Sequence, residues 1–284
     1  MALSYGAHPL MTRPPISTAS AAVRSVDVLR RGESAATRDE VAVELPLEVR
    51  LNGYPFSVIM RTPGQDGDLA LGFLFAEGVV RRRDDVVRID VDEATGVTNI
   101  VFARGRDERV ADALDQRRQV AMNSSCGLCG RRSLETLALE APPCRAEWSV
   151  SAAMVGALPN LLRSAQSAFA QTGGLHAAGL FDVDGRLEAS AEDVGRHNAV
   201  DKLLGRMLDA GRLPLAGSLL FVSGRSSFEI VQKAWMGGIP FVAAVSAPSS
   251  LAVDLAGEAG MTLLGFVRDG RFNIYAHPER VAAG

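Results

Sequence analysis

The sequence predicts an α/β protein, with a small β-rich N-terminal domain and a larger, layered α/β domain after it. In residues 41–103, two pairs of alternating apolar runs are each separated by turn residues, which is typical of β-hairpins. In residues 152–267, segments alternate in the order α-β-β-α-β-α-β-α-β, which predicts a layered domain with a mostly parallel sheet. We expect a flexible leader (1–22), the β-rich domain (23–115), a mobile loop (116–133) and the α/β domain (134–284).

The composition restricts the class of protein. The 284 residues suffice for one large or two ordinary domains, and 47% of them are hydrophobic. A formal net charge of −3 argues against a general nucleic-acid-binding protein. No apolar run reaches the roughly 18 residues of a membrane-spanning helix, and residues 1–20 lack the apolar segment of a secretory signal. We expect a cytoplasmic protein with neither nucleic-acid nor membrane partners.

Turn residues and apolar spacing predict the elements of the β-rich domain. Asn52-Gly53 separates the runs Leu45–Leu51 and Tyr54–Met60, and this dipeptide tolerates the positive φ of a type I′ turn. A second hairpin is expected over residues 86–103, with its turn near Thr95-Gly96. Helices are expected over residues 68–80 and 107–119.

Apolar periodicity predicts the elements of the α/β domain. Residues 152–170 have the spacing of one amphipathic helix, which Pro159 disturbs. Further helices are expected over residues 197–208, 226–236 and 249–259, and strands over residues 177–182, 187–191, 218–222, 240–245, 261–267 and 272–275.

The three cysteines, Cys126, Cys129 and Cys144, are too few for a disulfide scaffold and suit a reducing compartment. Cys126 and Cys129 form a C-x-x-C in a loop rich in glycine and serine. Such a pair is compatible with a zinc site, a dithiol–disulfide redox pair, or nucleophilic transfer of sulfur. A closed zinc site needs four ligands, and a thioredoxin-type pair follows a strand that is not evident here. The spacing alone leaves all three open.

Sulfur transfer would use a thiolate that attacks a persulfide and takes its outer sulfur. Arg131 and Arg132 follow the pair directly and favour the thiolate by their charge. Glycines beside the cysteines allow the loop to move between two partners. Cys144, next to Pro142-Pro143, is expected to be a bystander.

Two junctions between a strand and a helix are candidates for an anion site. One contains Asp193 and Arg196, and the other is Ser223-Gly224-Arg225-Ser226. Ligands collect at the carboxyl ends of strands in open α/β sheets, and helix starts there offer free N–H groups to phosphates. Gly224 permits close approach of the backbone, and Arg225 adds a planar donor fork. Ser226 or Ser227 is also expected to cap the helix, with Glu229 completing a capping box.

The sequence indicates the roles of His197 and His176 less clearly. Asp193, His197 and Asp201 are spaced at i, i+4 and i+8, so we expect them on one helix face. A carboxylate–histidine pair there is compatible with a base, a metal site or a structural hydrogen bond. His176 precedes an apolar strand and either lines the pocket or belongs to the core.

The element order of the second domain is that of the cytidine-deaminase fold, but the sequence lacks its zinc site. A zinc deaminase needs H-x-E followed by P-C-x-x-C. His176-Ala177-Ala178 has alanine where the glutamate is needed, and the C-x-x-C comes earlier in the chain without a preceding proline. We therefore expect a deaminase-like fold with no metal of its own and an anion pocket in place of the zinc.

The sequence resembles one family over residues 31–275: the formate dehydrogenase accessory sulfurtransferases, or FdhD family. The ordered motifs that carry the resemblance span most of the chain, and they agree at the cysteine pair. They are residues 43–48, 51–53, 62–63, 69–74, 77–78, 123–130, 172–178, 192–202, 223–226 and 247–252.

The resemblance implies a specific role. Such proteins accept sulfur from a cysteine desulfurase as a cysteine persulfide. They pass it to a molybdenum bis-molybdopterin guanine dinucleotide cofactor for formate dehydrogenase. It also implies a homodimer, a guanine-nucleotide site and Cys126 as the carrier, assisted by Cys129.

The cofactor pocket is expected at Ser223, Gly224, Arg225, Ser226, Asp193, Arg196, His197 and His176. The alternative is a chaperone that binds the molybdenum cofactor without covalent sulfur chemistry.

Overall fold

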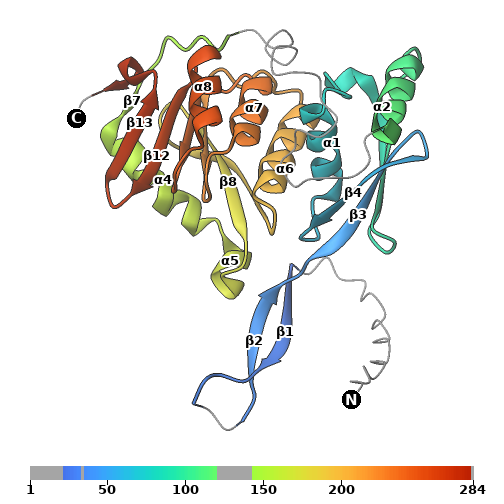
Figure 1. Cartoon of the computed structure of the whole chain (residues 1–284), viewed down its shortest axis with the longest axis horizontal. Coiled ribbons are helices and arrows are strands. Elements are labelled where there is room, and N and C mark those ends of the chain that lie inside the picture. Colours follow the sequence, from blue (N-terminus) through green and yellow to red (C-terminus); the bar gives the residue numbers. More distant parts are fainter. Residues whose placement is uncertain (1–21, 33–34, 120–142, 283–284) are drawn as a thin grey trace, which may run out of the picture.

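The fold is described from a computed structural model that defines residues 22–32, 35–119 and 143–282 (Figure 1). The expected leader lies outside the described residues except for Ala22, and residues 120–133 of the expected cysteine loop lie outside them too. In the described part of the chain, no helix is both long and apolar enough to cross a bilayer.

Four strands form the first sheet, and both predicted hairpins are confirmed in it. The turn between β3 (Leu45–Leu51) and β4 (Tyr54–Arg61) has positive φ at Asn52 (50°) and Gly53 (87°), as a type I′ turn requires. β5 (Val86–Asp92) and β6 (Val97–Phe102) form the second hairpin. β3 and β6 are parallel neighbours, so the strand order is β4-β3-β6-β5.

α1 (Asp66–Ala76) packs on the inner face of this sheet, where Leu69 and Leu74 are fully buried with Leu47 and Ile100. The helix ends before the predicted Val80, because Gly78 takes a positive φ of 72° after the last turn. α2 (Asp107–Gln119) has the predicted bounds.

A two-stranded ribbon, β1 (Val23–Val28) and β2 (Thr37–Ala42), extends from the body of the molecule (Figure 1). It was not predicted as a pair of strands, because it has no fully buried face to give an apolar pattern. The remaining short elements are η1 (Arg83–Asp85), η2 (Pro278–Arg280) and the parallel pair β7 (Val150–Ser151) and β14 (Val281–Ala282).

Six strands form the second sheet in the order β13-β12-β11-β10-β8-β9. Of the neighbouring pairs, β10–β11 and β11–β12 are parallel and the other three are antiparallel, so the sheet is mixed and the prediction of a mostly parallel sheet is wrong. β8–β9 and β12–β13 are hairpins with short turns, which force antiparallel pairing. The strands are β8 (His176–Asp182), β9 (Leu187–Asp193), β10 (Ser218–Val222), β11 (Phe241–Ala244), β12 (Thr262–Arg268) and β13 (Arg271–Ala276).

Helices cover both faces of the second sheet, so this part of the chain has the three layers of an α/β fold (Figure 1). One face packs against α6 (Arg196–Asp209), α7 (Phe228–Met236) and α8 (Ser250–Glu258), all three at predicted positions. The other face packs against α4 (Ala152–Ser164).

The single helix predicted over residues 152–170 is in fact two. Pro159 lies inside α4 and does not end it. The break comes at Ala165 and Gln166, and α5 (Ser167–Thr172) follows. Gln166 has a non-helical φ of −91° and ψ of 73°, so the chain changes direction there.

The two halves of the molecule meet where α1 crosses α6. Gly72 of α1 lies against the carbonyl of Asp201, and Gly205 of α6 lies against the carbonyl of Asp68. A Cβ atom at either glycine would overlap that oxygen. The crossing therefore depends on a glycine from each helix.

Candidate functional site

The eight residues predicted for the pocket gather at one edge of the six-stranded sheet. The carboxyl end of β10 lies there beside the amino end of antiparallel β8. The Ala177 N–H donates to Ser223 Oγ over 2.9 Å, and the Ser223 N–H donates to the Ala177 carbonyl over 3.0 Å. His176 is paired in register with Asp193 at the end of β9. This is the kind of edge at which ligands of open α/β sheets bind.

Gly224 lies against two other residues of the predicted pocket. A Cβ atom added at Gly224 would be 3.4 Å from His176 Nδ1 and 3.7 Å from Arg196 Cδ. Burial, followed by the charge of Arg196, lowers the pKa of His176, so its imidazole is neutral at pH 7. Arg225 is exposed beside them. Two guanidinium groups and an accessible backbone form an environment that suits an anion.

Two buried polar atoms at this edge have no hydrogen-bond partner among the described residues. They are Arg196 Nε and Ser226 Oγ. Buried polar atoms almost always have a partner in the protein or the solvent. Arg196 is the first residue of α6, where backbone N–H groups are also free to bind an anion. The N–H groups at the start of α6 are therefore the donors that this edge offers to a ligand, whereas Ser226 is 0% exposed.

His197 is held by α7 and not by a carboxylate of its own helix. Its Nε2 lies 3.1 Å from Ser227 Oγ, and its Nδ1 lies 3.4 Å from Glu229 Oε2. Burial is the main cause that lowers the pKa of His197 to about 4, and the charges of Arg196 and Lys233 add to it against Glu229. His197 is therefore neutral at physiological pH.

The predicted helix face of Asp193, His197 and Asp201 is wrong. Asp193 belongs to β9 and precedes the helix. The Asp201 carboxylate points to α7, where Lys233 Nζ donates to its two oxygens over 2.7 and 2.9 Å. Burial raises the pKa of Asp201 to about 6. Burial also opposes the charge of Lys233, but the neighbouring carboxylates outweigh it and raise the pKa of this amine.

The predicted capping box at α7 is also wrong. Ser227 occupies the position before the helix, but its side chain makes no capping hydrogen bond. Its hydroxyl lies against His197, and Glu229 forms an ion pair with Lys233 at 3.2 Å. The tertiary partners therefore replace the local cap.

Asp193 joins segments of the chain and has no free oxygen for a ligand. Its Oδ2 lies 2.7 Å from Lys202 Nζ and accepts from the Thr62 N–H over 3.1 Å. Its Oδ1 accepts from the Gly195 N–H and from Asn198 Nδ2, each over 2.8 Å. Asp193 is 0% exposed. Asp193 therefore holds neighbouring segments of the chain in place and does not bind a ligand itself. Its position in the sequence did not indicate this role.

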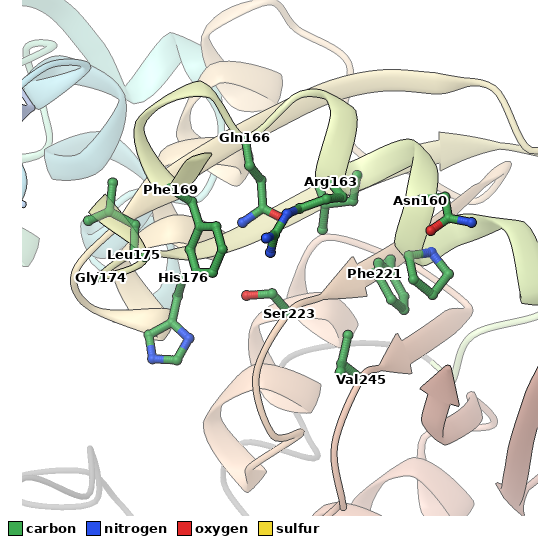
Figure 2. Close-up of a pocket in the computed structure, with 13 residues that line it drawn as sticks. Asn160, Arg163, Gln166, Phe169, Gly174, Leu175, His176, Phe221, Ser223 and Val245 are labelled. Atoms are coloured by element: carbon green, nitrogen blue, oxygen red, sulfur yellow. The ribbon is translucent and has the colours of Figure 1, made fainter. Parts of the chain in front are cut away.

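A cavity of about 520 Å³ opens beside the edge, on the face that α4 covers (Figure 2). Of the residues predicted for the pocket, His176 and Ser223 line it. Arg163, Gln166 and Phe169 also line it, and sequence reasoning missed them. They lie in a segment that was predicted as one continuous helix, so nothing in the pattern indicated that their side chains meet.

The comparisons with known proteins decide the family. The family model that matches the chain is described as FdhD/NarQ and covers residues 42–282. The chain belongs to the FdhD/NarQ family. The resemblance stated from the motifs is confirmed.

Relatives of this FdhD/NarQ chain share its length and much of its sequence. A sulfur carrier protein of Streptomyces avermitilis is 47% identical over 91% of this chain and 95% of its own length. A sulfur carrier protein of Anaeromyxobacter dehalogenans is 49% identical over 92% and 94%. The crystal structure of a protein assigned as a formate dehydrogenase accessory protein from Desulfotalea psychrophila is similar with a TM-score of 0.72. It is 28% identical and covers 92% of this chain and 98% of that one.

Of the three cysteines of this FdhD/NarQ chain, the structure describes the surroundings of Cys144. Cys126 and Cys129 lie outside the described residues. Cys144 is buried, its Sγ lies 3.7 Å from the Ile239 carbonyl, and burial raises the pKa of its thiol to about 11. Such a thiol is a poor nucleophile. Among the residues with described positions, no three His, Cys, Asp or Glu side chains are grouped to hold a metal.

Proposed function

We propose that this chain is a sulfurtransferase that takes sulfur from a cysteine desulfurase and delivers it to a molybdenum cofactor. The sulfur travels as a persulfide on Cys126, and the acceptor is the bis-molybdopterin guanine dinucleotide cofactor needed for formate dehydrogenase activity. One observation carries the proposal: proteins named sulfur carrier proteins are 47% and 49% identical over about nine-tenths of this chain. The motif Cys126-Gly127-Leu128-Cys129 supplies the nucleophiles.

The proposed chemistry balances with two thiols. The Cys126 thiolate attacks the outer sulfur of the donor persulfide, whose S–S bond breaks and whose cysteine leaves as a thiolate. Cys126 then carries the –S–SH group. In delivery, the Cys129 thiolate attacks the Cys126 sulfur, hydrosulfide leaves toward the cofactor, and a Cys126–Cys129 disulfide forms. The two thiols thus supply the two electrons that reduce the sulfur, and a cellular thiol reductant restores them.

The cofactor is the substrate in this proposal, and the sheet edge is its binding site. Its phosphates would interact with Arg196 and Arg225 and with the free donors where α6 and α7 begin. Gly224 allows the phosphates to approach the backbone. His176, neutral at pH 7, adds a hydrogen-bonding group without adding charge. Both ring nitrogens of His197 already face side chains of Ser227 and Glu229, so His197 supports the site and does not bind the ligand itself.

The partners in the proposal are a cysteine desulfurase, formate dehydrogenase and a second copy of the chain. They follow from the family resemblance. The competing proposal is a chaperone that binds the cofactor and carries no sulfur. The unsatisfied donors at the sheet edge support binding in both cases, so the cysteines decide between them.

The decisive experiment follows added sulfur by mass. The purified chain is incubated with a cysteine desulfurase and cysteine, and its peptides are analysed with and without a reductant. We expect one reducible added sulfur on the peptide that contains Cys126 and Cys129, and its loss in Cys126→Ala. Cys144→Ala is the matched control and should keep the added sulfur. A wild-type chain that gains no sulfur but still binds the cofactor would favour the chaperone proposal.

A further inference from the structure

We infer that Glu192 is a positioning residue of the proposed cofactor site, because its carboxylate holds the start of α5 against β9. This role rests on the proposed function, since it concerns how the same substrate site keeps its shape. Through Phe169, α5 forms one wall of the cavity beside the sheet edge (Figure 2). Glu192 takes no part in the proposed sulfur transfer itself.

α5 is a short helix with little packing of its own. Of its six residues, Ala168 is the buried one. Gln166, directly before the helix, makes no capping hydrogen bond with its side chain, and Gly173, directly after it, has a left-handed φ of 65°. A helix of this length is not stable by itself in water. The position of α5 therefore depends on contacts from other parts of the chain.

The Glu192 carboxylate supplies such a contact. Its Oε2 accepts from the Ala168 N–H over 3.1 Å, and its Oε1 accepts from the Phe169 N–H over 2.8 Å. These are two of the backbone donors that a helix start leaves without a partner, and the dipole of the helix also favours a negative charge there. Glu192 thus has, from a separate strand, the role that a local capping residue has in other helices.

Glu192 and Asp193 are neighbours in β9 and hold helix starts on opposite faces of the sheet. Successive side chains of a strand point to opposite faces, so the Glu192 carboxylate reaches α5 whereas Asp193 reaches α6. Asp193 Oδ1 accepts from the N–H of Gly195, the residue before α6. The Glu192 carbonyl oxygen also accepts from Lys202 Nζ of α6 over 3.2 Å. Two consecutive residues therefore fix the helix starts on both sides of the sheet edge.

The position of α5 affects the cavity at two places. Phe169 lines the cavity directly. After α5 the chain passes through Gly173 and Gly174 to His176, which lines the cavity as well. The ribbon of β1 and β2 also packs on α5, and a Cβ atom added at Gly174 would lie 3.5 Å from the Cβ of Ala42 in β2. Release of α5 would therefore change the cavity and loosen the ribbon at the same time.

Glu192→Gln tests this role in the full chain. The amide keeps the length of the side chain but has one acceptor oxygen and no charge, so one of the two N–H groups loses its partner. We expect hydrogen exchange at the Ala168 and Phe169 amides to become about tenfold faster or more, the usual effect of losing a charged hydrogen bond. Calorimetric binding of GDP, the probe for the proposed cofactor, should weaken about threefold or more, because fewer chains hold the cavity in its binding shape.

Two further variants make the test specific. Glu188→Gln is the matched control, because Glu188 lies in the same strand and its carboxylate binds Arg212, so exchange of α5 and GDP affinity should not change. Glu192→Asp keeps the charge but is shorter by one methylene group, so a role through hydrogen bonds predicts the same losses as Glu192→Gln.

The positioning role of Glu192 is overturned if both Glu192 variants keep the wild-type exchange of α5 or the wild-type affinity for GDP. It is also overturned if exchange rises equally in all elements, because the loss would then be one of global stability. A wild type that binds no GDP rejects the proposed cofactor site, whereas wild-type exchange and affinity in both variants reject the role of Glu192 alone.

Discussion

At the residue scale, burial keeps the imidazole of His197 neutral. Its neighbours from α6 and α7 include two cations, Arg196 and Lys233, and one carboxylate, Glu229. The cations and the loss of water outweigh the carboxylate, so the pKa falls to about 4 from the ordinary 6.5. Since Glu229 also pairs with Lys233, it does not have a full charge to offer to the imidazole.

This depressed pKa predicts a loss of stability in acid. Between pH 6.5 and 4 the unfolded chain binds a proton at His197 that the folded chain does not, so the free energy of unfolding falls as pH falls. His197→Gln should flatten this pH dependence in urea unfolding measured from pH 7 to pH 4.5. An unchanged slope in the variant would show that His197 is protonated equally in both states.

Glycine, arginine and serine at a strand–helix junction favour an anion site, so the sequence alone selected several residues of the candidate site, and their role in binding stays a prediction. The residues that contact them could not be predicted. His197 was matched to carboxylates by helix spacing, yet its partners come from α7, about 30 residues later. Spacing describes only contacts within one helix, and packing between helices decides which side chains meet. Gln166 and Arg163 were missed because residues 152–170 were predicted as one helix, although the chain breaks at Gln166.

At the element scale, the crossing of α1 and α6 depends on two glycines. Gly72 and Gly205 bring the helix backbones together, because neither has a Cβ atom to hold them apart. The obstacle to a larger residue is a carbonyl oxygen of the backbone in each case, and backbone atoms cannot rotate away. The helices would have to separate.

Gly205→Ala should therefore destabilise the chain by more than about 2 kcal/mol, in the upper range for overpacking. Gly257→Ala is the control, because an added Cβ in α8 would meet no atom within 4 Å. It should be neutral or stabilise by up to about 1 kcal/mol, since alanine favours helix. The midpoints of urea unfolding of the two variants, each compared with the wild type, test this prediction. A small effect of Gly205→Ala would mean that the helices can move apart cheaply.

The elements themselves were largely predictable from local signals. The Asn52-Gly53 hairpin and the helices near residues 197–208 and 249–259 are set by turn chemistry and apolar periodicity. The direction of the strands was not predictable, because the pairing of strands depends on neighbours that are distant in sequence. One helix disturbed at Pro159 was predicted over residues 152–170, since proline is a strong local signal, whereas the chain breaks at Gln166. The likeness to the cytidine-deaminase fold stays a prediction.

At the scale of the whole molecule, one buried ion pair connects the two halves. Lys202 Nζ lies 2.7 Å from Asp193 Oδ2 and donates to the Thr62 carbonyl over 2.9 Å. Thr62 follows β4 of the first sheet, whereas Asp193 and Lys202 belong to the second half. Asp193 accepts from the Thr62 N–H as well. Together with the α1–α6 crossing, these contacts join the two sheets that the sequence assigned to separate domains.

The ion pair predicts that both halves unfold together. Asp193→Asn leaves the Lys202 charge buried without its counter-charge, which costs about 3–5 kcal/mol. Trp148 and Trp235 report on the second half by fluorescence, and hydrogen exchange of β3 and β6 amides reports on the first sheet. Both midpoints in urea should shift down by the same amount. Asp184→Asn, at an exposed hairpin turn, is the control and should cost less than about 1 kcal/mol. If only the fluorescence midpoint moves, the halves are independent domains and the buried pair stabilises just one of them.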